Sequence, residues 1–179
     1  VIGAGGGAPF ANTKSLSFDG IDDYLDCGVI STLSLAPKVT VSTWIKAVTV
    51  DTGNGVIFST VGLNQGDILR LLKYGGDLYL EINTSAGTAR NYSAIPFGSV
   101  EGYLNDTWYN ITIVFDGTAT GNANRLKSYI DGVLISTTFT GTIPTTLFDN
   151  TGFASPRGVF TLAKDLLVLP ALMFNGNVD

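Results

Sequence analysis

The sequence predicts an all-β protein built as a two-sheet antiparallel sandwich. Short segments in which apolar and polar residues alternate recur between turn signals along the 179-residue chain, and this spacing is typical of β-sandwiches. No window with helical periodicity is long enough to indicate a stable helix. About twelve strands in one domain imply two packed sheets of roughly five to seven strands each.

The clearest local prediction is a β-hairpin in the segment ILRLLKYGGDLYLEIN, Ile68–Asn83. Its two-residue Gly75–Gly76 loop suits a primed turn, which requires positive φ angles that glycine adopts readily. This register gives the hairpin one apolar face and a more polar face on the opposite side, because side chains alternate along a strand. The cross-strand pairs it predicts are Lys73–Leu78, Leu71–Leu80, Leu69–Ile82, Leu72–Tyr79 and Arg70–Glu81.

A second hairpin is predicted at Arg125–Thr137, with its turn at Asp131–Gly132. Its register pairs Ile130 with Val133 and Tyr129 with Leu134. The other strand candidates share alternation and a high content of β-branched or aromatic residues. They are Ser15–Phe18, Asp23–Cys27, Val39–Ala47, Val56–Val61, Trp108–Phe115, Val159–Lys164 and Ala171–Phe174.

The chain is expected to hold one domain behind a glycine-rich leader. Residues 1–13 contain GAGGGAP and predict a flexible linker, so the sandwich is assigned to residues 14–179. No apolar stretch reaches the length of about 18 residues that indicates a membrane span. The net charge of −5, without a basic cluster, argues against a nucleic-acid partner, since phosphate neutralisation needs grouped Lys and Arg.

The residue inventory argues against an enzyme. The chain has no histidine, which excludes Ser-His-Asp and Cys-His nucleophiles, leaves Cys27 without an activating base, and excludes a His-ligated zinc site. Only two glutamates occur, Glu81 and Glu101. Asp77 and Glu81 share a strand face but lie roughly 13 Å apart along it, whereas retaining glycosidases need carboxyl groups about 5–5.5 Å apart.

Four aspartates crowd the segment SLSFDGIDDYLDCG, Ser15–Gly28. Asp19-Gly20 and Asp22-Asp23 can form a polar turn between two strands, since Asp and Gly tolerate the required dihedral angles. The same carboxylates can hold a hard cation such as Ca²⁺, which prefers several oxygen ligands. Direct ligand binding is the third interpretation, and the three remain open from the residues alone.

Five motifs in order resemble the laminin-G-like, concanavalin-A-like jelly-roll superfamily of lectins and glucanases. They are SLSFDGIDDYLDCG, VTVSTWIKA, TWYNITIVFDG, LKSYIDGVLI and FNGNVD, and the resemblance extends over nearly the whole chain from Lys14. The residue sequence of the first motif is most similar in style to copies of this domain in tailed-phage virion proteins. In this family the closing motif continues into a further strand, so the resemblance implies that the last strand is missing or supplied from outside, which leaves an open sheet edge.

The resemblance implies a non-catalytic, lectin-like binding or adhesion module of an extracellular or virion structural protein, contacting glycans or neighbouring subunits. The alternative is a purely architectural decoration domain of a phage capsid or tail. A diverged glycoside hydrolase is disfavoured, because the ExDxE or ExDxxE motif of the family's glucanases is absent. Family members often carry a structural calcium near the junction of the first and last strands. Carried over, this implies Asp19 or Asp22 as ligands, with Asp179 closing the site.

A glycan site is expected on the polar face of the first hairpin. Sugar rings stack on aromatic faces, and polar side chains read their hydroxyl groups. Trp108 and Trp44 join this site if the sheet is concave, since each lies opposite its strand's regular apolar row. The opposing interpretation is that these aromatics only cover the core. The predicted ligand-binding residues are Tyr79, Glu81, Asn83, Arg70, Trp108 and Trp44, with Tyr92, Phe97 and Tyr103 contributed by nearby loops.

Overall fold

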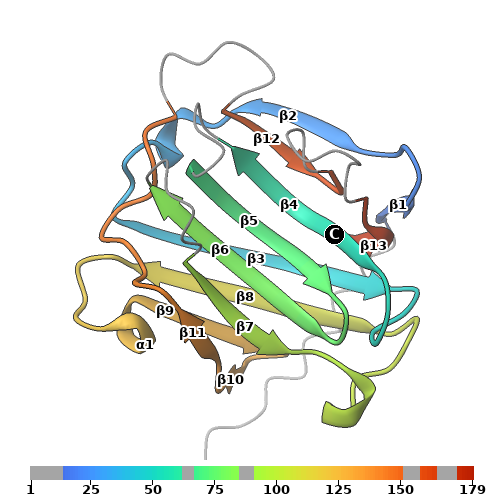
Figure 1. Ribbon diagram of the computed structural model, residues 1–179. Coiled ribbons are helices and arrows are strands. Elements are labelled where there is room, and N and C mark those ends of the chain that lie inside the picture. Colours follow the sequence, from blue (N-terminus) through green and yellow to red (C-terminus); the bar gives the residue numbers. More distant parts are fainter. Residues whose placement is uncertain (1–13, 62–66, 85–90, 151–157, 165–172) are drawn as a thin grey trace, which may run out of the picture.

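The structure is a computed structural model that describes residues 14–61, 67–84, 91–150, 158–164 and 173–179. These residues form two β-sheets packed face to face, and Figure 1 shows strands of one sheet lying in front of strands of the other. Every pairing between named strands is antiparallel. The predicted all-β sandwich is therefore confirmed.

The first sheet has six strands. Their order across the sheet is β1 (Leu16–Asp19), β13 (Asn175–Val178), β3 (Lys38–Ala47), β8 (Trp108–Asp116), β9 (Leu126–Ile130) and β10 (Val133–Ile135). The closing segment of the sequence thus itself supplies a strand, between the first strand and β3. Whether a further strand belongs to the fold stays a prediction, as does the leader at residues 1–13, which lies outside the described residues.

The second sheet has seven strands. Their order is β11 (Thr138–Thr140), β7 (Tyr92–Pro96), β6 (Asp77–Thr84), β5 (Asp67–Tyr74), β4 (Asn54–Val61), β12 (Val159–Leu162) and β2 (Leu25–Val29). The helical elements among the described residues are short: η1 (Ser31–Leu33), η2 (Ser99–Glu101) and α1 (Asn122–Arg125). Within the described ranges, no helix is long and apolar enough to cross a membrane.

Both hairpins form with the predicted register. The β5–β6 ladder contains all five predicted pairs, including Arg70 opposite Glu81, and the β9–β10 ladder pairs Ile130 with Val133. At the second turn, Asp131 and Gly132 have φ angles of 50° and 78°, which are the positive values that a type I′ turn requires.

Three strands were not predicted: β7, β11 and β13. Each has at most five residues. Two of them also contain a residue that weakens a strand signal, Pro96 at the end of β7 and Gly176 within β13, whereas β11 has only three residues, too few for a clear alternation. The predicted strand Ala171–Phe174 falls partly outside the described residues. Of its residues, Met173 and Phe174 are described, and Met173 forms an isolated β-bridge with Val56.

The core lies between the sheets and is filled by side chains that alternate inward from both. Ile45 and Phe115 from the six-stranded sheet and Leu71 and Leu80 from the seven-stranded sheet are each at most 1% exposed. Because successive side chains on a strand point to opposite faces, these core residues fix which neighbours face outward. The outward-facing residues carry the candidate site.

Candidate functional site

The outer face of the seven-stranded sheet gathers the polar residues of the first hairpin. Leu69 and Leu71 on β5 and Leu78 and Leu80 on β6 point into the core. Because side chains alternate along a strand, the residues at the alternate positions of β5 and β6 project from the opposite side of the sheet. In order along the chain, these residues are Arg70, Leu72, Tyr74, Tyr79 and Glu81.

A pocket of about 290 Å³ lies on this face and is lined by Leu72, Tyr74, Tyr79, Glu81 and Tyr92; we refer to it as the tyrosine pocket. The ring of Tyr79 makes edge contacts with both other rings, at centroid distances of 6.1 Å to Tyr74 and 5.2 Å to Tyr92. Three adjacent strands contribute the rings, because β6 lies between β5 and β7. The pocket therefore combines aromatic walls with one carboxylate.

A buried ion pair holds that carboxylate in place. Arg70 and Glu81 lie directly opposite each other in the β5–β6 ladder and are each 2% exposed. The Nε of Arg70 donates to the Oε2 of Glu81 at 3.0 Å, and a second guanidinium nitrogen contacts the same oxygen. Two donors on one carboxylate fix its orientation as well as compensating its charge.

Tyr79 keeps its hydroxyl proton well beyond neutral pH. Burial raises the pKa of the Tyr79 hydroxyl above its ordinary value, and the nearby Asp77 carboxylate raises this pKa further. The same hydroxyl donates to Asp77 Oδ2 at 3.3 Å. At neutral pH the phenol is therefore an uncharged group that can also accept a hydrogen bond.

Asn83 does not line the pocket. It is 4% exposed, and its Oδ1 accepts a 2.7 Å hydrogen bond from the backbone N–H of Asn91. Its side-chain oxygen thus ties the end of β6 to the residue that precedes β7. The observed role of Asn83 is thus to organise the backbone, and its contact with a ligand stays a prediction.

The two tryptophans lie on the opposite side of the sandwich. Trp44 on β3 and Trp108 on β8 belong to the six-stranded sheet and are 45% and 37% exposed. Lys46 lies beside them, with its Nζ 5.7 Å from the ring centroid of Trp108. The structure thus corrects the expectation of one combined site: alternation predicts that a residue faces outward, but not from which sheet.

Two of the loop aromatics also serve another purpose. Phe97 is 1% exposed and packs against Tyr103 and Tyr109, with ring centroids 4.9 Å and 5.4 Å away. Phe97 belongs to the core and Tyr103 packs against it, so neither residue lines the tyrosine pocket. Sequence reasoning missed Tyr74 as a site residue, although its position two residues after Leu72 was a usable signal.

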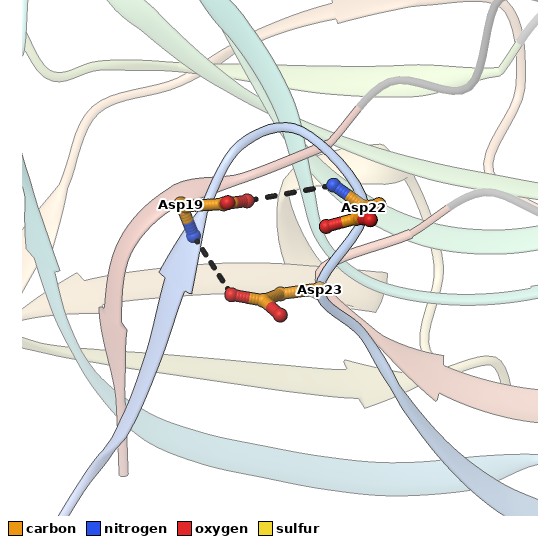
Figure 2. A group of neighbouring side chains, drawn as sticks. All are labelled: Asp19, Asp22 and Asp23. Atoms are coloured by element: carbon orange, nitrogen blue, oxygen red, sulfur yellow. Dashed lines mark hydrogen bonds between the residues drawn. The ribbon is translucent and has the colours of Figure 1, made fainter.

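Three of the four aspartates of the first motif, Asp19, Asp22 and Asp23, lie together at the turn between β1 and β2, as Figure 2 shows. The Oδ1 of Asp19 accepts hydrogen bonds from the backbone N–H groups of Ile21 at 2.7 Å and Asp22 at 3.4 Å, and the Oδ2 of Asp23 accepts one from Asp19 at 3.3 Å. One carboxylate oxygen from each of Asp19, Asp22 and Asp23 lies within 4.8 Å of the others, and all three residues are exposed. We call this group the aspartate turn.

The structure does not bring Asp179 to the aspartate turn. Strands β1 and β13 run antiparallel, so Asp19 lies opposite Asn175 while Leu16 lies opposite Val178. Asp179 follows at the far end of this ladder, where its backbone N–H and C=O pair with Trp44 at 2.9 Å and 2.8 Å. Asp23, which the sequence prediction of the metal ligands left out, takes the third place in the cluster.

The fold is similar to several solved structures. The CBM40 of the Ruminococcus gnavus IT-sialidase, bound to alpha2,3 sialyllactose, has 13% sequence identity and a TM-score of 0.60, with 92% of this chain and 87% of that chain covered. A native heptameric SAP-like pentraxin from Limulus polyphemus has 17% identity and a TM-score of 0.55, with coverage of 91% and 71%.

The binding domain of botulinum neurotoxin DC, in complex with rat synaptotagmin II, has 15% identity and a TM-score of 0.51; the match covers 83% of this chain but only 30% of that chain. No curated protein matches the sequence. At these identities the structural likeness establishes the fold.

A family model described as "Concanavalin A-like lectin/glucanases superfamily" matches residues 19–159. The match spans most of the chain and contains four of the five motifs in whole or in part. It also agrees with the two-sheet architecture and with the similar structures. The chain belongs to the concanavalin A-like lectin/glucanase superfamily.

Proposed function

We propose that the protein is a non-catalytic, lectin-like module that binds a glycan in the tyrosine pocket. The observation that carries this proposal is the convergence of three tyrosine rings and one fixed carboxylate on a single hollow of about 290 Å³. A sugar ring presents an apolar C–H face and a rim of hydroxyl groups, so it needs aromatic walls and a few placed polar groups.

The chemistry of each lining residue suits this role. The rings of Tyr74, Tyr79 and Tyr92 offer surfaces for the C–H face of a sugar. The carboxylate of Glu81 is held by Arg70 and serves as a fixed hydrogen-bond acceptor for sugar hydroxyls. The Limulus pentraxin shares this fold, and so does the R. gnavus domain, which is bound to alpha2,3 sialyllactose; these likenesses lend general support.

The positions of the glutamates support a binding module over a glycosidase. Glu81 is committed to the ion pair with Arg70. The Oε2 of Glu101 accepts a hydrogen bond from the backbone N–H of Gly98 at 3.1 Å, which places this glutamate in the η2 turn. Hydrolysis requires two carboxyl groups facing one sugar, and among the residues that line the tyrosine pocket Glu81 alone carries a carboxyl group.

A glycan array tests the proposal with a matched pair of variants. Tyr79→Ala removes the central ring of the pocket and is expected to weaken glycan binding at least tenfold, since aromatic contacts dominate such sites. Trp108→Ala removes a partly exposed aromatic from the opposite face and is expected to leave binding unchanged. Equal binding by both variants, or loss with Trp108→Ala alone, would reject the tyrosine pocket as the site.

An architectural role is the second candidate, and the partly exposed pair Trp44 and Trp108 favours it. Tryptophan is enriched where proteins contact one another. In this role the module sits on an extracellular or virion surface and contacts neighbouring subunits through the six-stranded sheet. An array without any binder, together with loss of particle assembly on Trp44→Ala, would favour this role over glycan binding.

We also infer that the aspartate turn can hold a structural Ca²⁺. Its three carboxylates are close enough to share one cation, and each keeps at least one oxygen without a hydrogen bond from the turn. Calcium prefers several oxygen ligands, and the exposed position leaves room for water to complete the set. Bound there, the ion would brace the β1–β2 connection.

A further inference from the structure

The rings that line the tyrosine pocket stand at steep angles to one another. The plane of the Tyr79 ring lies at 86° to that of Tyr74 and at 64° to that of Tyr92. Rings at such angles do not form one flat platform for an extended chain of sugars. They border the hollow of about 290 Å³ from different sides, so the pocket suits a single sugar unit that carries a compact substituent.

The charged groups at the pocket have an excess of negative charge. Glu81 belongs to the lining, and Asp77 lies beside it, where its Oδ2 accepts a hydrogen bond from the Tyr79 hydroxyl at 3.3 Å. None of the described residues that line the pocket is a lysine or an arginine. Arg70 is 2% exposed, and its positive charge offsets the negative charge of Glu81. Among these three charged groups, the Asp77 carboxylate is therefore in excess.

The Tyr79 hydroxyl reflects this charge. Burial raises the pKa of this hydroxyl, and the Asp77 carboxylate raises the pKa further. A neighbouring negative charge has this effect because it disfavours the phenolate. The same charge stabilises a cation placed against the rings.

We propose that the substituent bound in the tyrosine pocket is the protonated amine of an amino sugar, an inference that rests on the glycan-binding function proposed above. Aromatic faces attract cations, and cages of aromatic rings are a recurrent site for ammonium groups. Glu81 and Asp77 add the attraction of their carboxylates. A neutral sugar gains only the contacts with the rings, and an acidic sugar such as sialic acid meets charge of its own sign.

Three sugars with the same ring test this inference. Glucosamine, N-acetylglucosamine and glucose differ at carbon 2, which carries an ammonium, an acetamide or a hydroxyl group, and the galactose series repeats the comparison. The NMR signals of the tyrosine ring protons report occupancy of the pocket during a titration. The amine form of at least one series is expected to bind about tenfold more tightly than its two neutral forms.

The preference is expected to depend on pH. An amine on a sugar carbon loses its proton in the range of an α-amino group, so a rise from about pH 6 to about pH 9 neutralises it. The preference for the amine form is then expected to disappear, whereas the binding of glucose stays the same. The raised pKa of Tyr79 keeps the pocket itself unchanged over this range. A preference that persisted at the higher pH would overturn the inference.

Two pairs of variants separate the rings from the charge. Tyr74 is 57% exposed, so the fold is expected to tolerate both Tyr74→Leu and Tyr74→Phe. The preference for glucosamine over glucose is expected to fall at least threefold further in Tyr74→Leu, which lacks an aromatic face. Asp77→Asn is expected to lower the preference, whereas Asp116→Asn, the same change of charge on the six-stranded sheet, is not. Equal effects within both pairs would overturn the inference.

The outcomes distinguish this inference from the function on which it rests. Equal binding of the amine and neutral forms would overturn the inference and leave the glycan-binding function intact. If neither these sugars nor any glycan of the array bound, the glycan-binding function itself would fail. Tyrosine signals that moved with choline and with no sugar would identify a cation site without a glycan, and both proposals would fail.

Discussion

The two sheets differ in how their outer faces accommodate charge. On the seven-stranded sheet, Arg70 and Glu81 form an ion pair that is almost fully buried. On the six-stranded sheet, Lys38 and Asp116 form a 2.8 Å pair whose side chains are 60% and 33% exposed. Both pairs join neighbouring strands directly across a ladder. The two pairs differ in their exposure to solvent, which screens the Lys38–Asp116 pair and leaves the Arg70–Glu81 pair largely unscreened.

This difference bears on the glycan site that we propose on the seven-stranded sheet. A buried pair has fixed geometry, because moving either partner leaves a charge without compensation in a medium of low polarity. The proposed role of Glu81 as a fixed hydrogen-bond acceptor beside Tyr79 and Tyr92 depends on this fixed geometry. An exposed pair has many accessible arrangements and is worth little in a binding site.

The largest expected effect comes from breaking the buried pair. Glu81→Ala leaves the Arg70 guanidinium buried without its carboxylate, and such changes cost about 3–5 kcal/mol of unfolding free energy. For a domain of this size this corresponds to a fall in Tm of roughly 6–20 °C. Urea and thermal unfolding measure both quantities.

The control for this prediction removes both charges. The double variant Arg70→Met/Glu81→Leu is expected to recover most of the loss, because an apolar pair of similar volume carries no desolvation penalty. Asp116→Ala, at the exposed pair, is expected to shift Tm far less. If Glu81→Ala and Asp116→Ala destabilised the protein equally, the contrast between the two faces would be refuted.

An effect of intermediate size on stability is expected from calcium at the aspartate turn. The carboxylates there are exposed, as in the Lys38–Asp116 pair, but three of them lie close together. Calcium at about 100 times its dissociation constant would stabilise the fold by roughly 2.7 kcal/mol, which raises Tm by about 5–11 °C. Differential scanning fluorimetry with calcium and with a chelator measures this shift. Asp22→Asn is expected to abolish it, whereas Asp26→Asn, which removes the same charge nearby, is expected to preserve it. The absence of any calcium-dependent shift in the unmodified protein would refute the ion site.

The fold was largely predictable because alternation and turn chemistry are local signals. Gly75–Gly76 and Asp131–Gly132 fixed the registers of two hairpins, and the order of the motifs indicated the superfamily that the family model identifies. Strands β7, β11 and β13 were missed, since each is short and holds its place through its neighbours. The pairing of β13 between β1 and β3 joins residues more than a hundred positions apart, which no local pattern reveals.

The candidate site was less predictable than the fold. Tyr79, Glu81 and Arg70 were brought together correctly by the hairpin register. The assignment of Trp44 and Trp108 to the same surface was wrong, because outward alternation is the same in both sheets and only the strand order separates them. That these residues bind a glycan stays a prediction.

The smallest expected effect concerns the exposed pair and its dependence on pH. The Lys38 ammonium, together with the Thr118 hydroxyl, lowers the pKa of Asp116 to about 2. A carboxylate whose pKa is lower in the folded state stabilises the fold above its unfolded pKa, near 4, and loses this contribution as pH falls toward 2. Unfolding in urea between pH 5 and pH 2 is therefore expected to show a shallower decline in stability for Asp116→Asn than for the unmodified protein. Added salt should reduce this difference, since the pair is exposed. If the unfolding free energy fell equally with pH in the two proteins, the Lys38–Asp116 contact would not be maintained in solution. The contrast between the two faces would then be between a buried ion pair and no ion pair at this position.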